Sequence, residues 1–153
     1  MAFVQSPFRI RRYQPPDWNE WFRMNRALFP GISEDEDVAE MRATLERPDA
    51  AVFVLERPDG LLAGYVEAGE RSIADGCLST PVGYIEAWFV DPDVRRGGNG
   101  KALLQAAEDW ARRRGRVEMA SDALIENEVS HRAHEHSGYI EVDRVVIYRK
   151  DLR

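Results

Sequence analysis

One segment carries most of the information about the fold: Val90-Asp91-Pro92-Asp93-Val94-Arg95-Arg96-Gly97-Gly98-Asn99-Gly100-Lys101. It leads from the end of an apolar run, through a basic and glycine-rich loop, into a segment with helical periodicity. Glycines let the backbone approach a ligand, amides at a helix N-terminus favour an anion, and basic side chains add positive charge. The segment is typical of a pyrophosphate-binding loop. A basic turn at a helix start would explain it equally well, and its spacing differs from the Walker and dinucleotide-binding motifs.

The remaining pattern predicts alternating strands and helices on both sides of this loop. A helix begins at Pro15-Pro16-Asp17 and stops at Pro30-Gly31, and Ser33 with Glu36 forms a capping box for a second helix that ends near Arg47-Pro48. Further helices are predicted over 102–114 and 126–136, and strands over 8–13, 51–56, 61–67, 82–90, 117–120 and 139–149. The predicted order is β-αα-ββ-β-α-β-α-β, which is an α/β (α+β) fold.

Length and composition indicate a single globular domain spanning residues 1–153. The hydrophobic content of 44% and charged content of 31% are those of a folded protein. A net charge of -6 argues against nucleic acid as the main partner and favours a cationic one. Cys77 is the only cysteine and cannot form an internal disulfide, and no apolar run approaches the length of a membrane span. We therefore expect a cytoplasmic protein that binds no membrane.

The motif Arg95-x-x-Gly98-x-Gly100, together with the element order, resembles the GNAT acetyltransferases. The resemblance implies a mixed central sheet whose parallel fourth and fifth strands are splayed, and acetyl-CoA as co-substrate without a metal. It implies that the cofactor pyrophosphate binds the loop and that its pantetheine arm lies along the preceding strand, with the Val90 N–H near the thioester carbonyl. The cofactor-binding residues implied are Trp88, Phe89, Val90, Arg95, Arg96, Gly97, Gly98, Asn99, Gly100, Lys101 and Asn127. His134 occupies the place of a tyrosine that protonates the departing thiolate in many members.

Finer matches are similar to one branch, the aminoglycoside 6′-N-acetyltransferases. They are Ser79-Thr80-Pro81-Val82-Gly83-Tyr84-Ile85-Glu86 and Ala120-Ser121-Asp122-Ala123, followed by Asn127 and Ser130-His131. The likeness covers nearly the whole chain. It implies direct, sequential acetylation of the 6′-amine of a cationic aminoglycoside by a homodimer. The acceptor-binding residues that it implies are Glu86, Asp122, Asp143 and the aromatic Phe29.

The same residues have plainer interpretations from the sequence alone. Glu86 lies in an apolar strand, so its carboxylate either faces a cleft or pairs with an arginine. Asp122 follows a strand, where an aspartate in a turn or helix cap is common. His134 is either an exposed helix residue or a general acid, and the three histidines lack the pattern of a zinc site. The acidic run 34–37 is adequately explained as a solvated helix N-terminus.

Two other functions remain open at this point. One is a GNAT enzyme that acts on a different amine, such as a polyamine or a protein N-terminus. The other is a non-catalytic sensor of acyl-CoA, which would bind the cofactor without turnover. Glu86 in a strand beside the cofactor loop favours catalysis.

Overall fold

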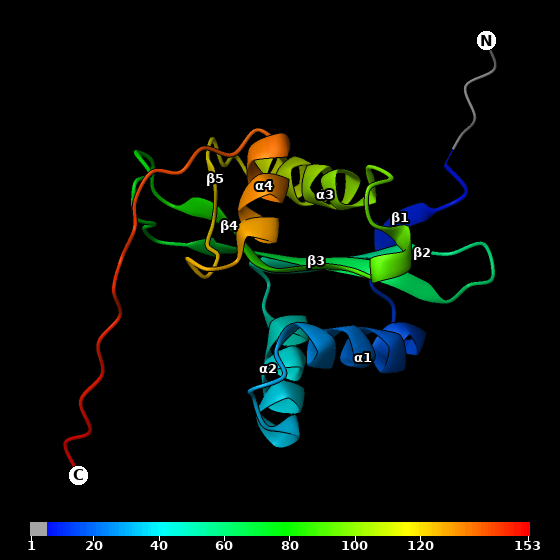
Figure 1. Cartoon of the computed structure of the whole chain (residues 1–153), viewed down its shortest axis with the longest axis horizontal. Helices are drawn as coiled ribbons and strands as arrows, with labels where there is room; N and C mark the ends of the chain where they lie inside the picture. The colour runs from blue at the N-terminus through cyan, green and yellow to red at the C-terminus, as the bar shows by residue number, and fades with distance from the viewer. Residues whose placement is uncertain (1–5) are drawn as a thin grey trace.

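The computed structural model describes residues 6–153 as a twisted sheet with helices on both faces (Figure 1). The strands are β1 (Arg9–Arg12), β2 (Ala50–Glu56), β3 (Leu62–Arg71), β4 (Val82–Val90) and β5 (Met119–Ser121). The helices are η1 (Pro15–Asp17), α1 (Trp18–Leu28), α2 (Glu34–Glu46), η2 (Pro92–Val94), α3 (Asn99–Arg113) and α4 (Glu128–His136). The strand order is β1-β2-β3-β4-β5, in which only β4 and β5 pair in parallel. The predicted order of elements is confirmed up to α4.

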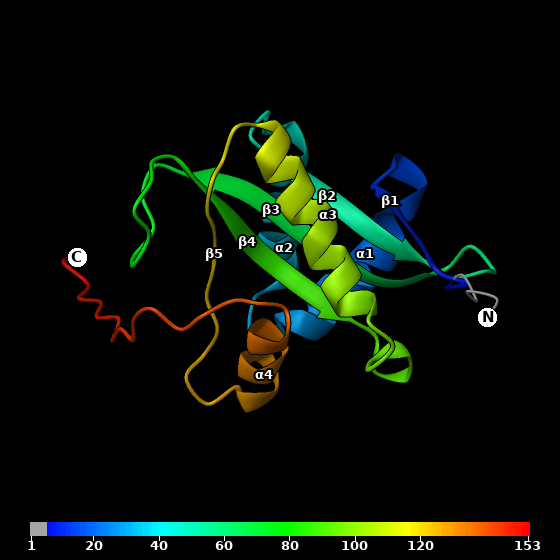
Figure 2. The same ribbon diagram turned by 90° about the horizontal axis from the view of Figure 1, so that it is seen from above.

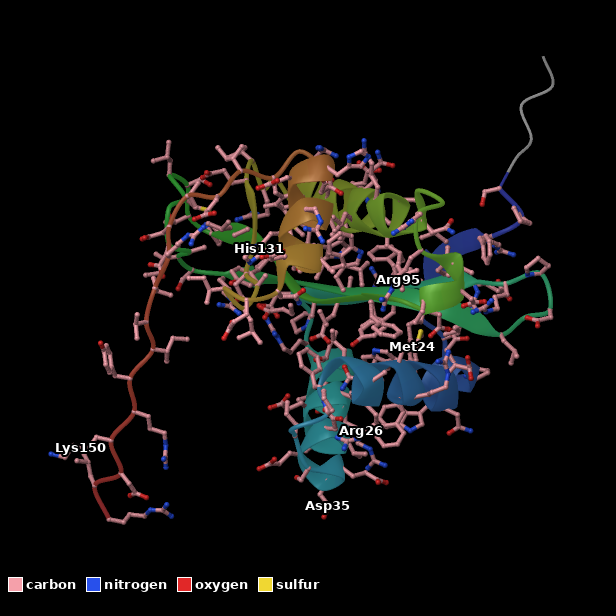
Figure 3. The ribbon with its side chains drawn as sticks, in the orientation of Figure 1. Met24, Arg26, Asp35, Arg95, His131 and Lys150 are labelled. Atoms are coloured by element: carbon pink, nitrogen blue, oxygen red, sulfur yellow. The ribbon has the colours of Figure 1, made fainter. Side chains whose placement is uncertain are left out.

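Each face of the sheet has its own apolar core. Helix α3 crosses one face with Leu103, Ala107 and Trp110 turned inward, and α4 lies beside it (Figure 2). Helices α1 and α2 cover the other face, where Trp21 and Met24 are fully buried (Figure 3). The spacing of these buried side chains follows the helical repeat that the sequence predicted. Among the described residues, we find no helix with the length and apolarity needed to cross a bilayer.

A buried polar network joins α1, α2 and β3. Asp37 is 1% exposed and accepts hydrogen bonds from Asn25 Nδ2 at 2.9 Å and from Arg26 Nη1 at 2.7 Å. Tyr65 on β3 donates to Asn25 Oδ1 at 2.6 Å. The prediction of a solvated acidic run is therefore wrong for Asp37. Its carboxylate is tolerated in the interior because amide and guanidinium donors satisfy it.

A β-bulge in β4 places Glu86. Glu67 on β3 pairs with Ala87 and the next residue, Ala68, pairs with Ile85, so Glu86 is the extra residue. Ile85 consequently packs in the α3 core, whereas Ala87 packs in the α1 core. A regular strand would have put both on one face and Glu86 on the other. Because of the bulge, Glu86 and Ala87 both face the side covered by α1 and α2, where the Glu86 Cγ lies near Gly69.

The strand predicted over 139–149 is wrong for the isolated chain. After α4 the chain has no regular structure and runs away from the sheet and helices to its C-terminus (Figure 1). Its apolar side chains are exposed, including Val145 at 63% and Ile147 at 89%. The alternating pattern is present, but a strand needs a neighbour for its backbone groups and for its apolar face. The single described chain does not supply that neighbour.

Candidate active site

The parallel strands β4 and β5 separate at the centre of the molecule. Their pairing ends at Ile85 and Ser121, whereas β4 continues to Val90 (Figure 2). The Asp91 N–H donates to Ala63 O of β3 at 2.7 Å, so the amide one residue earlier points the opposite way, toward the gap beside β4. The Val90 N–H therefore faces the space between the diverging strands. The carbonyl oxygen of an acyl group bound in this space could accept a hydrogen bond from the Val90 N–H.

The loop after β4 has an unusual backbone that leads directly into the N-terminus of α3. Arg96 and Gly98 both have left-handed backbone angles, with φ of 69° and 80°, and α3 begins at Asn99. A non-glycine residue in this region is uncommon and is often found at ligand sites. The first amides of α3 have no intrahelical partner, and the helix N-terminus carries partial positive charge. Together with exposed Arg96 and Lys101, this geometry suits a pyrophosphate.

Several contacts hold the loop in place. Arg95 Nε donates to Val90 O at 2.8 Å, and Asn99 Nδ2 donates to Val94 O at 3.3 Å. Trp88 Nε1 donates to Gly100 O at 3.1 Å, and a Cβ at Gly100 would lie 3.1 Å from the Trp88 ring. Figure 3 shows Arg95 at the end of the sheet where β4 meets this loop. The conformation of the loop is thus held by the side chains of Arg95, Asn99 and Trp88. Among the contacts of the described residues, the Arg96 side chain makes no hydrogen bond or ion pair.

A surface hollow of about 400 Å³ continues from the loop along α3. It is lined by Lys101, Gln105 and Arg112, with the acids Glu108 and Asp109 and with Ser137 after α4. The hollow lies on the α3 side of the sheet, opposite the face that carries Glu86.

Two of the three acids predicted to bind the acceptor, Glu86 and Asp122, lie close together on the α1 and α2 face, but each already has a partner. Glu86 accepts two hydrogen bonds from Arg71, from Nε at 3.0 Å and from Nη2 at 2.7 Å. The Arg71 guanidinium lies 3.5 Å from the centre of the Tyr84 ring, and Tyr84 Oη donates to Asp122. The Glu86 side chain is 24% exposed. The pairing with an arginine is thus confirmed, and the carboxylate is at the same time partly accessible.

Glu67 is a further acid at this site that the sequence did not single out. It accepts a hydrogen bond from Thr44 Oγ1 of α2 at 2.8 Å. Burial raises the pKa of Glu67, and the negative charge of Glu86 adds to the shift. Its position at the end of an apolar run was the only signal available, and such positions are usually strand ends. Arg71 and Tyr84 were also missed, because their roles depend on cross-strand contacts.

His134 lies on the α3 side of the gap, with both ring nitrogens engaged. Nδ1 is 2.7 Å from Ser130 O, which can only accept, so Nδ1 carries the proton of the neutral ring. Nε2 is 2.7 Å from Ser121 Oγ at the end of β5 and then accepts the hydroxyl proton. The ring also packs edge-on against Trp88 and Tyr139. His134 therefore joins α4 to β5 beside the place where the strands diverge.

The other predicted residues are more scattered. Phe29 ends α1 and packs against the core that contains Ala87, next to Glu86. Asn127 caps α4 by accepting from Ser130 N at 3.1 Å. Asp143 lies on the exposed C-terminal segment, where it accepts from the Arg144 amide, and the chain does not bring it to Glu86 or Asp122. Among the described residues, no group of three or more His, Cys, Asp or Glu has a metal-binding arrangement.

Comparison with known proteins gives matches over nearly the whole chain. Residues 18–139 match the model described as the Acetyltransferase (GNAT) family. An aminoglycoside N(6′)-acetyltransferase type 1 of Klebsiella aerogenes is 39% identical over 147 residues, covering 94% of this chain and 96% of that protein. One of Stenotrophomonas maltophilia is 35% identical over 150 residues, covering 97% of each.

Solved structures give the same result. AAC(6′)-Iy in complex with the bisubstrate analog CoA-S-monomethyl-acetylneamine has a TM-score of 0.89 at 33% identity, covering 95% of this chain and 99% of that one. AAC(6′)-Ih from Acinetobacter baumannii has a TM-score of 0.88 at 28% identity with the same coverage.

Proposed function

Because this chain belongs to the GNAT acetyltransferase family, we propose that it transfers the acetyl group of acetyl-CoA to the 6′-amine of aminoglycosides. The observation that carries the proposal is similarity over almost the full length to enzymes of that name. Acetylation removes a positive charge from the drug, so the activity confers resistance. The single cysteine supports a reducing compartment, the cytoplasm, as the site of action.

The cofactor is proposed to bind on the α3 side of the gap. Its pyrophosphate accepts hydrogen bonds from the amides of Gly97 to Gly100, and Arg96 and Lys101 balance its charge. The thioester lies along the end of β4, where the Val90 N–H points into the gap and would stabilise negative charge on the carbonyl oxygen. Trp88 and Phe89 line this path through their backbone. Asn127, which caps α4, is proposed to contact the cofactor with its side-chain amide group.

The acceptor is proposed to bind on the opposite face of the sheet. Glu86 and Asp122 attract the drug's ammonium groups, and Phe29 provides an apolar surface for a sugar ring. An ammonium cannot attack a thioester until it loses a proton, so Glu86 orients the amine and accepts that proton through water. The free amine then attacks the carbonyl carbon directly, its nitrogen loses the remaining extra proton to water, and the thiolate of CoA leaves and is protonated by His134 or water. Transfer is sequential because both substrates must be bound at once.

We expect His134→Ala to lower turnover by less than about tenfold, below the range of 10² to 10⁴ typical of a general acid. The neutral ring has its proton on Nδ1, directed at Ser130 O, and water can protonate a thiolate. Steady-state kinetics with saturating acetyl-CoA measures the effect, and a melting curve separates it from loss of folding. A loss above about a hundredfold in a folded variant would make His134 the proton donor.

A coupled assay for released thiol tests the function itself. The purified chain should release CoA with kanamycin-type drugs far faster than with spermidine or a peptide N-terminus, the acceptors of the two alternative amine activities. Mass spectrometry of the drug should show one added acetyl group, at the 6′-amine. Binding of acetyl-CoA without turnover on any of these amines would instead indicate a non-catalytic sensor.

We also propose that the protein is a homodimer in which the C-terminal segments are exchanged. Two sets of exposed apolar side chains support this. One is on the segment after α4 and includes Ile140, Val145 and Ile147; the other, near β5 and α4, includes Leu124 and Val129. Strand β5 is the last in the sheet order, so its outer edge is open within the described chain. A segment from a second copy would cover that edge and bury both sets. Asp143 would move with it.

The mass in solution should therefore be about twice the 17.5 kDa of one chain. Light scattering coupled to gel filtration measures it at micromolar concentration. Ile147→Asp should shift the population toward monomer, because a charge is then placed in the buried interface. The control is Arg42→Asp, because Arg42 is an exposed residue of α2, and this variant should leave the dimer intact. Thr44→Asp on the same helix would not serve, because Thr44 contacts Glu67. A 17.5 kDa species that persists at all concentrations would contradict the proposal.

A further inference from the structure

Arg71 lies at the position beside Glu86 that is proposed to bind the cationic acceptor. Its guanidinium donates hydrogen bonds to both carboxylate oxygens of Glu86 and lies over the Tyr84 ring, whose hydroxyl donates to Asp122. The hydrogen bond to Glu86 raises the pKa of Arg71, and Asp122 acts in the same direction. The Arg71 side chain therefore covers the Glu86 carboxylate and the face of the Tyr84 ring. Its positive charge also offsets part of the negative charge of Asp122.

The Arg71 side chain has the properties of a displaceable group. It is the last residue of β3, is 44% exposed and precedes an irregular segment that runs to β4. Ion pairs at this exposure contribute little stability, because water competes for both partners. The buried pair of Arg26 with Asp37 contrasts with it, since that carboxylate is 1% exposed and is fixed by two donors. Glu86 can therefore exchange Arg71 for another cation.

We propose that Arg71 is a positioning and specificity residue that neutralises Glu86 in the free enzyme and is displaced by the ammonium groups of the drug. The inference rests on the proposed role of Glu86 in binding the acceptor. Displacement uncovers the Tyr84 ring as a surface for a sugar and leaves Glu86 next to the amine. A monoamine has to displace the guanidinium with one charge, whereas a polycation supplies several. Arg71 thus favours acceptors with more than one ammonium group.

Three consequences can be measured. Arg71→Ala should lower the KM for a polycationic aminoglycoside by about threefold to tenfold, because the drug no longer competes with an internal cation. The fall in KM should be larger for an acceptor with a single amine. The variant should therefore prefer polycations over monoamines less strongly than the wild type does. The KM for acetyl-CoA should not change, since Arg71 lies on the opposite face of the sheet from the cofactor loop. Arg71→Lys keeps a cation without the paired geometry and should fall between the two.

A double-mutant cycle identifies whether Arg71 acts through Glu86. In a Glu86→Gln background, Arg71→Ala should no longer lower the KM. Arg114→Ala is the matched control, because Arg114 pairs with Glu70 of the same strand and not with an acceptor acid. Melting curves of all variants check folding, and Arg71→Gln replaces Arg71→Ala if the latter is unstable.

The outcomes separate this inference from the proposed function. An unchanged or higher KM in folded Arg71→Ala, or an equal fall in the Glu86→Gln background, overturns the role of Arg71. If Glu86→Gln alone changes neither KM nor turnover, the acceptor site itself has been misassigned. If Glu86→Gln impairs the reaction and Arg71→Ala has no effect, only the inference about Arg71 fails.

Discussion

Glu86→Gln should lower the turnover of aminoglycoside acetylation by about 10²-fold or more, the usual contribution of a positioned base. An aliphatic ammonium has a pKa close to that of lysine, about 10.4, so near neutral pH almost all of the drug amine is protonated. Glutamine has nearly the shape of glutamate but can neither accept the proton nor balance the charge. The affinity for acetyl-CoA should be unchanged, because Glu86 lies on the face away from the cofactor loop.

The pH profile gives the sharper test of this role. Without a base, the reaction depends on amine that has already lost its proton, so the activity of Glu86→Gln should keep rising with pH and its optimum should move upward. Asp122→Asn should differ, with a higher KM for the drug and nearly normal turnover, since the proposed role of Asp122 is to bind the drug without taking part in proton transfer. Glu70→Gln, which removes a carboxylate paired with Arg114 on the same sheet, is the control. Equal turnover in Glu86→Gln and wild type at neutral pH would refute the role.

Local signals were sufficient for most of the fold. The predicted capping box at Ser33 is present, with Glu36 N donating to Ser33 Oγ, and α3 buries the apolar residues that its periodicity indicated. These features depend on residues close together in the chain. The failure at 139–149 has a different origin, because a strand needs a neighbour to pair with and the described chain places none beside this segment. A sequence pattern describes which residues can pair but not what they pair with.

The site was predicted less completely, for a similar reason. The loop proposed to bind the pyrophosphate could be singled out because its glycines and basic residues lie in one continuous segment. The environment of Glu86 could not, since it depends on a bulge in β4 and on Arg71, which a hairpin brings from the neighbouring strand. Asp37 gives the same lesson, because an acidic run suggested solvent and the structure places this one carboxylate among donors from α1. Contacts between segments that are distant in the sequence determine which charged side chains are paired and which are available to a ligand.

The loop before α3 leads to the second large effect, on cofactor binding. Arg96→Glu should weaken acetyl-CoA binding by roughly 1.5 to 3 kcal/mol, about tenfold to a hundredfold, the loss of one charge-assisted hydrogen bond to a phosphate. Arg95 is expected to be the more structural of the two arginines, since its Nε donates to Val90 O. Arg96 is exposed and has a left-handed backbone that helps to turn the amides inward.

Calorimetric titration of the free enzyme with acetyl-CoA measures this effect without relying on turnover. Arg113→Glu makes the same change of charge on an exposed residue at the other end of α3, so it controls for the general field of the protein. The difference between the two variants should shrink as salt is added, because exposed charges are screened over about 10 Å at 0.1 M. The KM for the drug should stay close to that of the wild type, since the acceptor acids lie on the other face of the sheet. If folded Arg96→Glu binds acetyl-CoA as tightly as Arg113→Glu does, the pyrophosphate does not bind at this loop.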